Sequence, residues 1–269
     1  MSRPAPLRVA CVGALGRMGE RVRTALAEAA DARLAGALEG AGHPGLGREL
    51  ARGVVVTADP AQAFADADVV IDFSVPGASL AALRAAAERG LAYVCGTTGF
   101  TSEQHAELAA LAKRVALVLA PNFSVAVNVL VHLAAEAARL LGPSFDAEIV
   151  ELHHAAKRDA PSGTALRLAA AVAEARGQDL ERALVLAREG ETGPRPAGAI
   201  GVQALRGGDN PGEHTVLLVG RGERLELIHR AATRDHFAAG ALHAARWAHG
   251  RPPGLYGMED VLELRPRRA

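Results

Sequence analysis

Short apolar runs alternate with alanine-rich stretches over the first 121 residues of the chain. The runs read RVACV, ARLAGAL, GVVVT, ADVVIDF, AYVCG and VALVLAP. Strands that are apolar on both faces and separated by helices are typical of a buried parallel sheet, because each crossover connection lays a helix against the sheet. The pattern therefore predicts an α/β fold whose N-terminal part is a Rossmann-like, doubly wound parallel sheet.

The pattern changes after Asn122. We expect an alanine-rich helix to about residue 141, a strand at DAEIVEL, another helix, and then three strand-like runs without helices between them, AIGVQALR, HTVLLVG and RLELIHRAA. Consecutive strands favour a second α+β domain built on a mixed or largely antiparallel sheet. We place the domains at residues 1–124 and 125–234, and expect residues 235–269, with a last helix at about 236–249, to return to the first domain.

A glycine-rich loop follows the first strand. In VACVGALGRMGERV, Gly13, Gly16 and Gly19 allow a tight turn and let backbone N–H groups approach a pyrophosphate at the start of a helix. Glu39 follows the second strand, where a dinucleotide site needs a carboxylate for the ribose hydroxyls. A turn without a ligand is the alternative, since the GxxGxxG spacing alone is weakly specific. Gly40 offers no arginine for a 2′-phosphate, so NADH is expected to be used at least as well as NADPH.

Two further loops follow later strands of the predicted sheet. CGTTGF carries Gly96, Thr97 and Thr98, and APNFS carries the segment 120–123. Open α/β sheets bind ligands at the carboxyl ends of their strands, so both loops could border a nicotinamide. Ordinary turn chemistry is the alternative for both.

The densest chemistry lies in the segment ELHHAAKRDAPSGT, residues 151–164. His153 and His154 are expected at the carboxyl end of a strand, Lys157 in the loop beyond it, and Ser162 at the N-cap of a helix. Histidine titrates near neutral pH, so this cluster can supply protons as well as positive charge. A solvated basic loop followed by an ordinary capped helix is the alternative.

The helix that follows Ser162 gives this cluster a second way to hold an anion. The N–H groups of Gly163 and Thr164 and the Thr164 hydroxyl can bind one carboxylate, where the helix dipole contributes about 0.3–1 kcal/mol. A histidine and a lysine beside them can hold a second carboxylate. The segment therefore predicts a site for a small dicarboxylate.

Composition and charge narrow the classes of protein. Lys plus Arg and Asp plus Glu each number 30, so the net charge is zero, and we expect no nucleic-acid or membrane partner. No run has the length of a signal peptide or of a membrane span, which predicts a cytoplasmic protein. Cys11 and Cys95 lie in strand-like runs and are expected to be buried, reduced thiols, and no metal site is expected.

Several motifs together resemble those of the 4-hydroxy-tetrahydrodipicolinate (dihydrodipicolinate) reductase family. They are GALGRMG, DFSVP, GTTGF, APNFSVAVN, ELHHAAKRDAPSGTA, GEHTVLL, GERLELIHRA and FAAGAL, in the family's order from about residue 8 to the C-terminus. The histidine segment is highly specific, whereas the glycine loop is not. Ala126 departs from the family's usual glycine, and Gly40 departs from members with an arginine after the acidic residue.

The resemblance implies NAD(P)H-dependent reduction of (2S,4S)-4-hydroxy-2,3,4,5-tetrahydrodipicolinate to tetrahydrodipicolinate with loss of water, in the diaminopimelate route to lysine. It implies His153 as the proton donor or acceptor, Lys157 as a second proton donor, and His154, Gly163 and Thr164 as substrate-binding residues. It implies a homotetramer formed through the second domain's sheet, and closure of the two domains on their ligands. The cofactor-binding residues it implies are Gly13, Ala14, Leu15, Gly16, Arg17, Met18, Glu39, Gly96, Thr97, Thr98, Ala120, Pro121, Asn122 and Phe123.

Two other classes of function remain open from the residues alone. Another two-domain NAD-dependent dehydrogenase would account for the glycine loop, but not for paired carboxylate-binding residues beside His153. A redox-sensing regulator would bind a dinucleotide together with DNA or a partner protein. Such regulators usually carry a DNA-binding module or a basic face, and the sequence shows neither.

Overall fold

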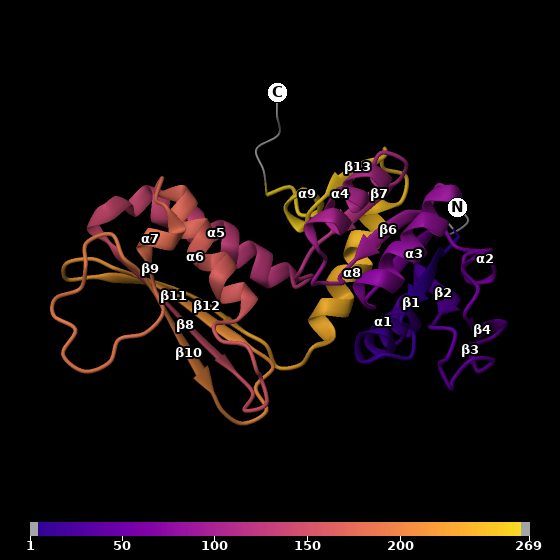
Figure 1. The fold of residues 1–269 in the computed structure, drawn as a ribbon, viewed down its shortest axis with the longest axis horizontal. Coiled ribbons are helices and arrows are strands. Elements are labelled where there is room, and N and C mark those ends of the chain that lie inside the picture. The colour runs from indigo at the N-terminus through magenta and orange to yellow at the C-terminus, as the bar shows by residue number, and fades with distance from the viewer. Residues whose placement is uncertain (1–4, 265–269) are drawn as a thin grey trace. The chain divides into compact units, whose positions relative to one another are not determined.

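The computed structural model describes residues 5–264, and their packing divides the chain into two compact units (Figure 1). One unit combines the chain up to Val125 with the chain from Asp235 onward, and the other is Ala126–Arg234. The C-terminal helix thus packs with the N-terminal sheet, to which it is not adjacent in sequence. Residues 265–269, at the end of the segment expected to return, lie outside the described residues.

The first unit is built on a sheet that has eight strands within the described residues. Their order is β13-β7-β6-β5-β1-β2-β4-β3, and all neighbouring pairs are parallel except β3 with β4. The strands are β1 (Leu7–Val12), β2 (Ala32–Leu38), β3 (Glu49–Ala51), β4 (Val54–Thr57), β5 (Val69–Asp72), β6 (Ala92–Cys95), β7 (Ala116–Leu119) and β13 (Gly254–Tyr256). The parallel sheet predicted from the apolar runs is confirmed, with an added antiparallel edge strand.

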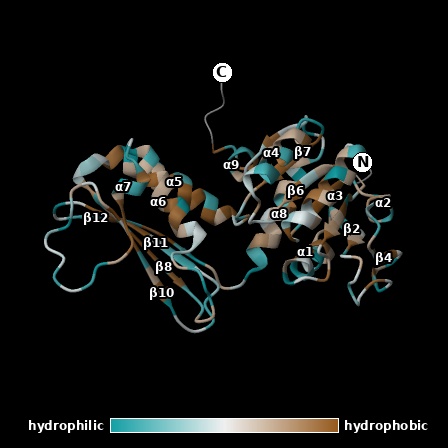
Figure 2. Ribbon diagram, in the orientation of Figure 1, coloured by the Kyte–Doolittle hydropathy of each residue, from teal (hydrophilic) through white to brown (hydrophobic). Residues whose placement is uncertain are grey.

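Helices cover both faces of this sheet, as the doubly wound pattern predicts. One face packs against α1 (Arg17–Glu28), α8 (Asp235–Ala248) and α9 (Met258–Val261). The other packs against α2 (Pro60–Ala63), α3 (Pro76–Glu88) and α4 (Ser102–Leu111). Figure 2 shows the sheet strands as hydrophobic bands among these helices. Both faces of the sheet are therefore shielded from solvent, which explains why the strands carry few polar residues.

The second unit, whose range 126–234 is described throughout, holds a five-stranded mixed sheet in the order β12-β11-β8-β10-β9. Its strands are β8 (Asp146–His153), β9 (Leu184–Val185), β10 (Ile200–Arg206), β11 (Glu213–Val219) and β12 (Arg224–Arg230). β8 runs parallel to β10 and antiparallel to β11. The three late strands are consecutive in sequence, but β8 lies between β10 and β11, so the sheet is mixed and not purely antiparallel.

Helices α5 (Val125–Leu141) and α6 (Gly163–Ala175) cover one face of this second sheet. Short elements complete the unit: η1 (Gly142–Ser144) and α7 (Leu180–Ala183). The core lies between sheet and helices, where Ile149, Val202 and Val216 meet side chains of α5 and α6. The same arrangement leaves the opposite face of the sheet without a covering helix.

One helical segment has the length and composition of a membrane span, although the sequence predicts none. Residues Val125–Ser144 form it, with a mean hydropathy of 1.4. One such helix says little, because the core helix of a soluble protein meets the same criterion. Here Leu130 and Ala134 pack into the second unit's core, and Glu136 is paired with Arg139 on the exposed side. This packing accounts for part of its apolar length, since 28% of the apolar stretch is buried and Leu133 and Leu140 are exposed.

Both cysteines are free and buried, as expected. Cys11 is 1% exposed in β1, and Cys95 is fully buried at the end of β6. Burial is the main cause that raises the pKa of each thiol to about 12, and the Asp72 carboxylate raises it further. Neither thiol is therefore ionised near neutral pH.

Candidate active site

Strand β8 brings two titratable side chains to the covered face of the second sheet. Its residues alternate between buried and partly exposed, and Ala147, Ile149, Glu151 and His153 all lie on the buried side. Ala147 and Ile149 belong to the apolar core, and Glu151 and His153 continue the same row toward the strand's carboxyl end. An acid in such a position must be fully hydrogen-bonded to be tolerated.

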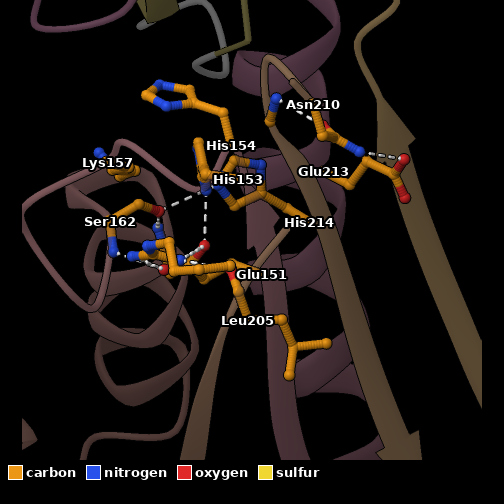
Figure 3. Close-up of polar contacts among 12 residues, drawn as sticks. Glu151, His153, His154, Lys157, Ser162, Leu205, Asn210, Glu213 and His214 are labelled. Carbon is orange, nitrogen blue, oxygen red and sulfur yellow. Dashed lines mark hydrogen bonds and ion pairs between the residues drawn. The ribbon is translucent and has the colours of Figure 1, made fainter. Parts of the chain in front are cut away.

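Glu151 meets that requirement with four hydrogen bonds and no solvent exposure (Figure 3). Oε1 accepts from Arg206 Nη2 at 2.9 Å and from the Ser162 N–H at 3.0 Å. Oε2 accepts from Arg206 Nη1 at 2.8 Å and lies 2.5 Å from His153 Nδ1. Burial raises the pKa of this carboxyl, but the bonds from Arg206, His153 and the Ser162 amide outweigh burial and leave the pKa below its ordinary value. Glu151 is therefore a carboxylate.

Because a carboxylate only accepts hydrogen bonds, the His153 Nδ1 must carry the proton in this pair. The other ring nitrogen, Nε2, then remains for chemistry. Burial lowers the pKa of His153, the contact with Glu151 raises it, and the charges of Lys157 and Arg206 lower it. The net pKa lies below the ordinary value, so in the chain alone the ring is mostly neutral at pH 7.

A second histidine packs against this ring from the neighbouring strand. His214 on β11 is paired with Glu151 in the sheet register, and its ring meets that of His153 edge to face with centroids 5.3 Å apart. His214 Nε2 lies 3.1 Å from the Ser162 hydroxyl. Burial lowers the pKa of His214 to about 3, so this ring is neutral. His214 therefore supports His153 by packing and does not add charge.

The two adjacent histidines are separated by the strand geometry. Figure 3 shows the His153 ring directed toward Glu151 and the His154 ring pointing away from it. His154 Nε2 lies 3.1 Å from Arg234 Nη2, and because arginine only donates, this nitrogen accepts the bond. Of the two, only His153 is joined to the buried network, which distinguishes their roles.

Lys157 lies in the loop after β8 and is largely covered, with 19% of its side chain exposed. Its Nζ donates to both carboxylate oxygens of Asp159, at 2.9 and 2.8 Å. Arg206 Nη2 donates to the Asp159 backbone carbonyl at 2.6 Å, which fastens this loop to β10. The ammonium is thus held near the end of β8 by a partner that is itself 64% exposed.

Helix α6 begins where the sequence predicts. Ser162 is its N-cap, and its hydroxyl accepts from the Ala165 N–H at 3.1 Å. The first-turn N–H groups, those of Gly163 and Thr164, precede the amide that Ser162 satisfies. The Ser162 N–H is bonded to Glu151, so the helix start and the histidine network share one anchor. Together, His153, Lys157 and the first turn of α6 surround the end of β8.

The glycine loop of the first unit has the backbone that its sequence predicts. Gly13 has φ +69°, and Gly16 is the N-cap of α1 without a side chain that could satisfy the first-turn amides. A Cβ on Gly19 would lie 2.1 Å from the Gly13 carbonyl oxygen, so only glycine lets helix and loop approach this closely. Ala14 is fully buried, and Met18 packs on the sheet core. The loop could accommodate a phosphate at the start of α1.

Glu39 follows β2 and turns toward the same loop. Its Oε1 accepts from the Leu15 N–H at 2.6 Å, which leaves Oε2 for another partner. Beside Leu15 lies a hollow lined by the basic side chains of Arg23, His43 and Arg48. The sequence places no base next to Glu39, but the fold gathers these three beside the loop that Glu39 contacts.

The loop after β6 is fixed by a buried carboxylate. Asp72, fully buried at the end of β5, accepts from Tyr93 Oη at 2.9 Å and from the Ser74 N–H at 2.8 Å. Thr97 Oγ1 accepts from the Ser74 N–H at 3.1 Å and is almost fully buried. A Cβ on Gly96 would collide with the Phe73 ring. Gly96 and Thr97 therefore shape the loop from inside, and Thr98 follows them.

The segment after β7 contributes mostly backbone. Ala120 and Phe123 are buried, at 3% and 1% exposure, and the Phe123 ring packs edge to face on Phe73. The Asn122 Oδ1 accepts from the Ser124 N–H at 2.8 Å and closes the turn before α5. The buried side chains of Ala120 and Phe123 cannot reach a ligand. Of the four residues predicted here, Pro121 and Asn122 are therefore the two whose side chains could border one.

Two family models match almost the whole chain. The model described as dihydrodipicolinate reductase, N-terminus, matches residues 7–123, and the one described as dihydrodipicolinate reductase, C-terminus, matches residues 126–262. The chain belongs to the dihydrodipicolinate reductase family. The family's C-terminal model includes α8, although this helix packs on the first unit's sheet.

Curated relatives and a solved structure agree with this family. A 4-hydroxy-tetrahydrodipicolinate reductase of Syntrophobacter fumaroxidans is 48% identical over 96% of this chain and 100% of its own length. One of Myxococcus xanthus is 49% identical over 95% of this chain and 97% of its length. A dipicolinate-bound dihydrodipicolinate reductase from Paenisporosarcina sp. TG-14 has the same fold, with a TM-score of 0.79 at 24% identity over 95% of this chain and 99% of that chain.

In this family member, the sequence reasoning missed the residues that hold His153. They are Glu151, Arg206 and His214. One signal was available: in AEIVELH, Glu151 occupies an alternate position that Ala147 and Ile149 mark as core. Arg206 and His214 come from other strands, and only the sheet register brings them to Glu151.

Proposed function

We propose that the chain reduces 4-hydroxy-tetrahydrodipicolinate to tetrahydrodipicolinate with NAD(P)H, releasing water, as a step of the diaminopimelate route to lysine. The observation that supports this most is the grouping of His153, Lys157 and the first turn of α6 at the end of β8, in a chain that belongs to the dihydrodipicolinate reductase family. Cations, a proton donor and helix N–H groups in one place suit a small dianion.

The substrate's two carboxylates have separate partners in this proposal. The N–H groups of Gly163 and Thr164 hold one, at the start of a 13-residue helix. Lys157 and His154 hold the other, with Lys157 exchanging Asp159 for the substrate. The Paenisporosarcina relative was solved with dipicolinate, a flat dicarboxylate, which is in keeping with such an arrangement.

His153 and Lys157 handle the protons of the reaction. Loss of the 4-hydroxyl together with a C5 proton releases water and leaves a C4–C5 double bond conjugated with the imine. A hydride then adds to C4, and the enamine so formed takes a proton at C5 from the enzyme's acid, His153 assisted by Lys157. His153 donates it from Nε2, since Nδ1 is engaged with Glu151. A bound dianion raises the pKa of His153 and so supplies the protonated ring that the chain alone lacks at pH 7.

The first unit fits a nicotinamide dinucleotide. Gly13 to Met18 would hold the pyrophosphate, Glu39 the adenosine ribose, and the loops at 96–98 and 120–123 would border the nicotinamide, which supplies the hydride when bound. The Glu39 carboxylate favours a ribose diol and repels a 2′-phosphate. Arg23 and Arg48 in the adjoining hollow, which Glu20 also lines, offset part of this repulsion. We therefore propose use of both coenzymes, with NADH used at least as well as NADPH.

A coupled assay tests the function. The substrate is formed in situ from pyruvate and aspartate semialdehyde by the preceding synthase, and NADH and NADPH consumption are followed separately. We expect turnover with both coenzymes. We also expect His153→Gln to lower kcat by about 10²- to 10⁴-fold, which is the contribution of a positioned acid, with little change in coenzyme KM.

Absence of turnover in the wild-type chain refutes the function, and unchanged kcat in the variant removes His153 from the acid role. A hundredfold preference for NADPH contradicts the coenzyme proposal.

The proposed assembly is a homotetramer formed through the uncovered face of the second sheet. Leu205, Val219 and Ile228 are exposed there, at 51%, 37% and 44%. The register of β10, β11 and β12 places them on the face opposite the helices. Large apolar side chains gathered on a sheet face favour burial by a second copy.

A further inference from the structure

We propose that Glu151, held by Arg206, is a positioning residue that keeps the proton of His153 on Nδ1 and presents Nε2 to the substrate. The inference deepens the proposed function and rests on it. Glu151 touches neither the substrate nor the coenzyme in this scheme. It acts only through the imidazole that it orients.

The bonding of Glu151 leaves no freedom in either partner. Each carboxylate oxygen accepts two hydrogen bonds, so the four acceptor positions of the group are filled. The carboxylate has no solvent exposure and the His153 side chain has 11%. A ring held at Nδ1 by a fully bonded, buried carboxylate cannot rotate without breaking a charge-assisted bond.

Arg206 decides which partner holds the proton. Without a cation, a buried glutamic acid would be protonated and would donate to Nδ1, which would leave the His153 proton on Nε2. The two-pronged bond from Arg206 keeps Glu151 ionised and therefore acceptor-only. The register supports this role, because Arg206 is the residue of β10 directly beside His153.

The other ring nitrogen, Nε2, faces a glycine. A Cβ on Gly212 would lie only 2.8 Å from Nε2. A glycine at this point keeps the ring edge accessible. The two ring nitrogens thus have different environments: Nδ1 is bonded to a carboxylate, and Nε2 faces a residue that has no side chain.

Titratable groups on several elements face His153, and the Glu151 carboxylate is the one that favours its protonated form. Glu151 lies on the same strand, Arg206 on β10, His214 on β11 and Lys157 in the following loop. The carboxylate raises the pKa of His153, whereas burial and the two cations lower it. Neutralising Glu151 therefore lowers this pKa further, and the protonated fraction above it falls about tenfold for each unit.

The test compares Glu151→Gln with Glu148→Gln. Glu148 is a matched control, a partly buried glutamate on β8 that is also paired with two arginines, Arg188 and Arg195, but does not contact His153. We expect Glu151→Gln to shift the alkaline limb of the kcat profile to lower pH and to reduce kcat at pH 7.5 by roughly 10- to 100-fold, with coenzyme KM unchanged. Glu148→Gln should leave the profile unchanged, and Glu151→Asp, which keeps the charge, should restore part of it.

Nitrogen NMR of the wild-type chain gives a readout that needs neither turnover nor a folded variant. We expect the neutral His153 to carry its proton on Nδ1. A proton on Nε2 overturns the proposal, as does a folded Glu151→Gln variant whose pH profile matches the wild type. If the wild type turns over no substrate, the proposed function fails, and the NMR result alone then decides whether Glu151 sets the tautomer.

Discussion

At the scale of single residues, Gly212 is a position where one added methyl group would touch the His153 ring. Its φ of +150° lies outside the range that other residues prefer, and its missing side chain leaves space at His153 Nε2. The Asn210 side chain fixes this turn by accepting from the Gly212 N–H at 2.8 Å. Backbone and ring are therefore held in contact distance by the loop itself.

Gly212→Ala should lower kcat at least tenfold, because the added methyl would cover Nε2, the nitrogen proposed to exchange the proton, and a misplaced acid loses its contribution. Steady-state kinetics with both coenzymes measures this. Gly207→Ala is the control, since this glycine lies in the same loop with no atom within 4 Å of a Cβ. Equal kcat in the two variants would show that Nε2 is not the working nitrogen.

The sequence predicts His153 and Lys157 as catalytic candidates but does not predict the residues that contact His153, and the reason is physical. His153 and Lys157 stand in a dense local motif, so their chemistry is visible in the chain itself. Arg206 and His214 act on His153 through strand pairing over more than 50 residues, which a local pattern does not encode. Glu151 was visible only as an acid at a core position of a strand.

At the scale of elements, the start of α6 contributes to the stability of the fold and is also the proposed carboxylate site. The Ser162 hydroxyl caps the helix and also lies against His214 Nε2, while its N–H bonds Glu151. Removing the hydroxyl therefore removes a cap and a partner of a buried ring together. Each loss costs free energy of unfolding.

Ser162→Ala should destabilise the chain by about 1–3 kcal/mol, combining a lost cap with an unpaired buried nitrogen. It should also raise the substrate KM, because the first turn of α6 is the proposed carboxylate site. Urea denaturation and kinetics measure the two effects. Thr101→Ala, which removes the cap of α4 in the first unit, is the control and should leave the substrate KM unchanged.

Strands in the interior of the first sheet were predictable, whereas the shortest strands, at sheet edges, were not. Apolar runs such as VVID and AYVC are buried on both faces, and such runs predict parallel strands. β3, β9 and β13 have only two or three residues and pair at sheet edges, where no periodicity can develop. The order of the second sheet also escaped prediction, because β8 pairs with strands that follow it much later.

At the scale of the whole molecule, the uncovered face of the second sheet is the interface of the proposed tetramer. Ile228→Glu should dissociate the proposed tetramer, since a charge cannot be buried there without a partner. Light scattering should then give a mass below four times the 27.8 kDa of one chain. Leu140→Glu, a 68% exposed leucine on α5, is the control. A wild-type chain that is monomeric contradicts the assembly, and an unchanged tetramer in Ile228→Glu contradicts the interface.

Because Cys11 and Cys95 are both buried, the surface of the described residues offers no thiol to thiol-specific reagents. Maleimide dyes react with thiolates, and neither sulfur reaches that form near pH 7. A cysteine introduced on the surface of each unit would then be labelled without removing the native pair. Energy transfer between the two dyes would then test whether the distance between the units changes when coenzyme and substrate are added.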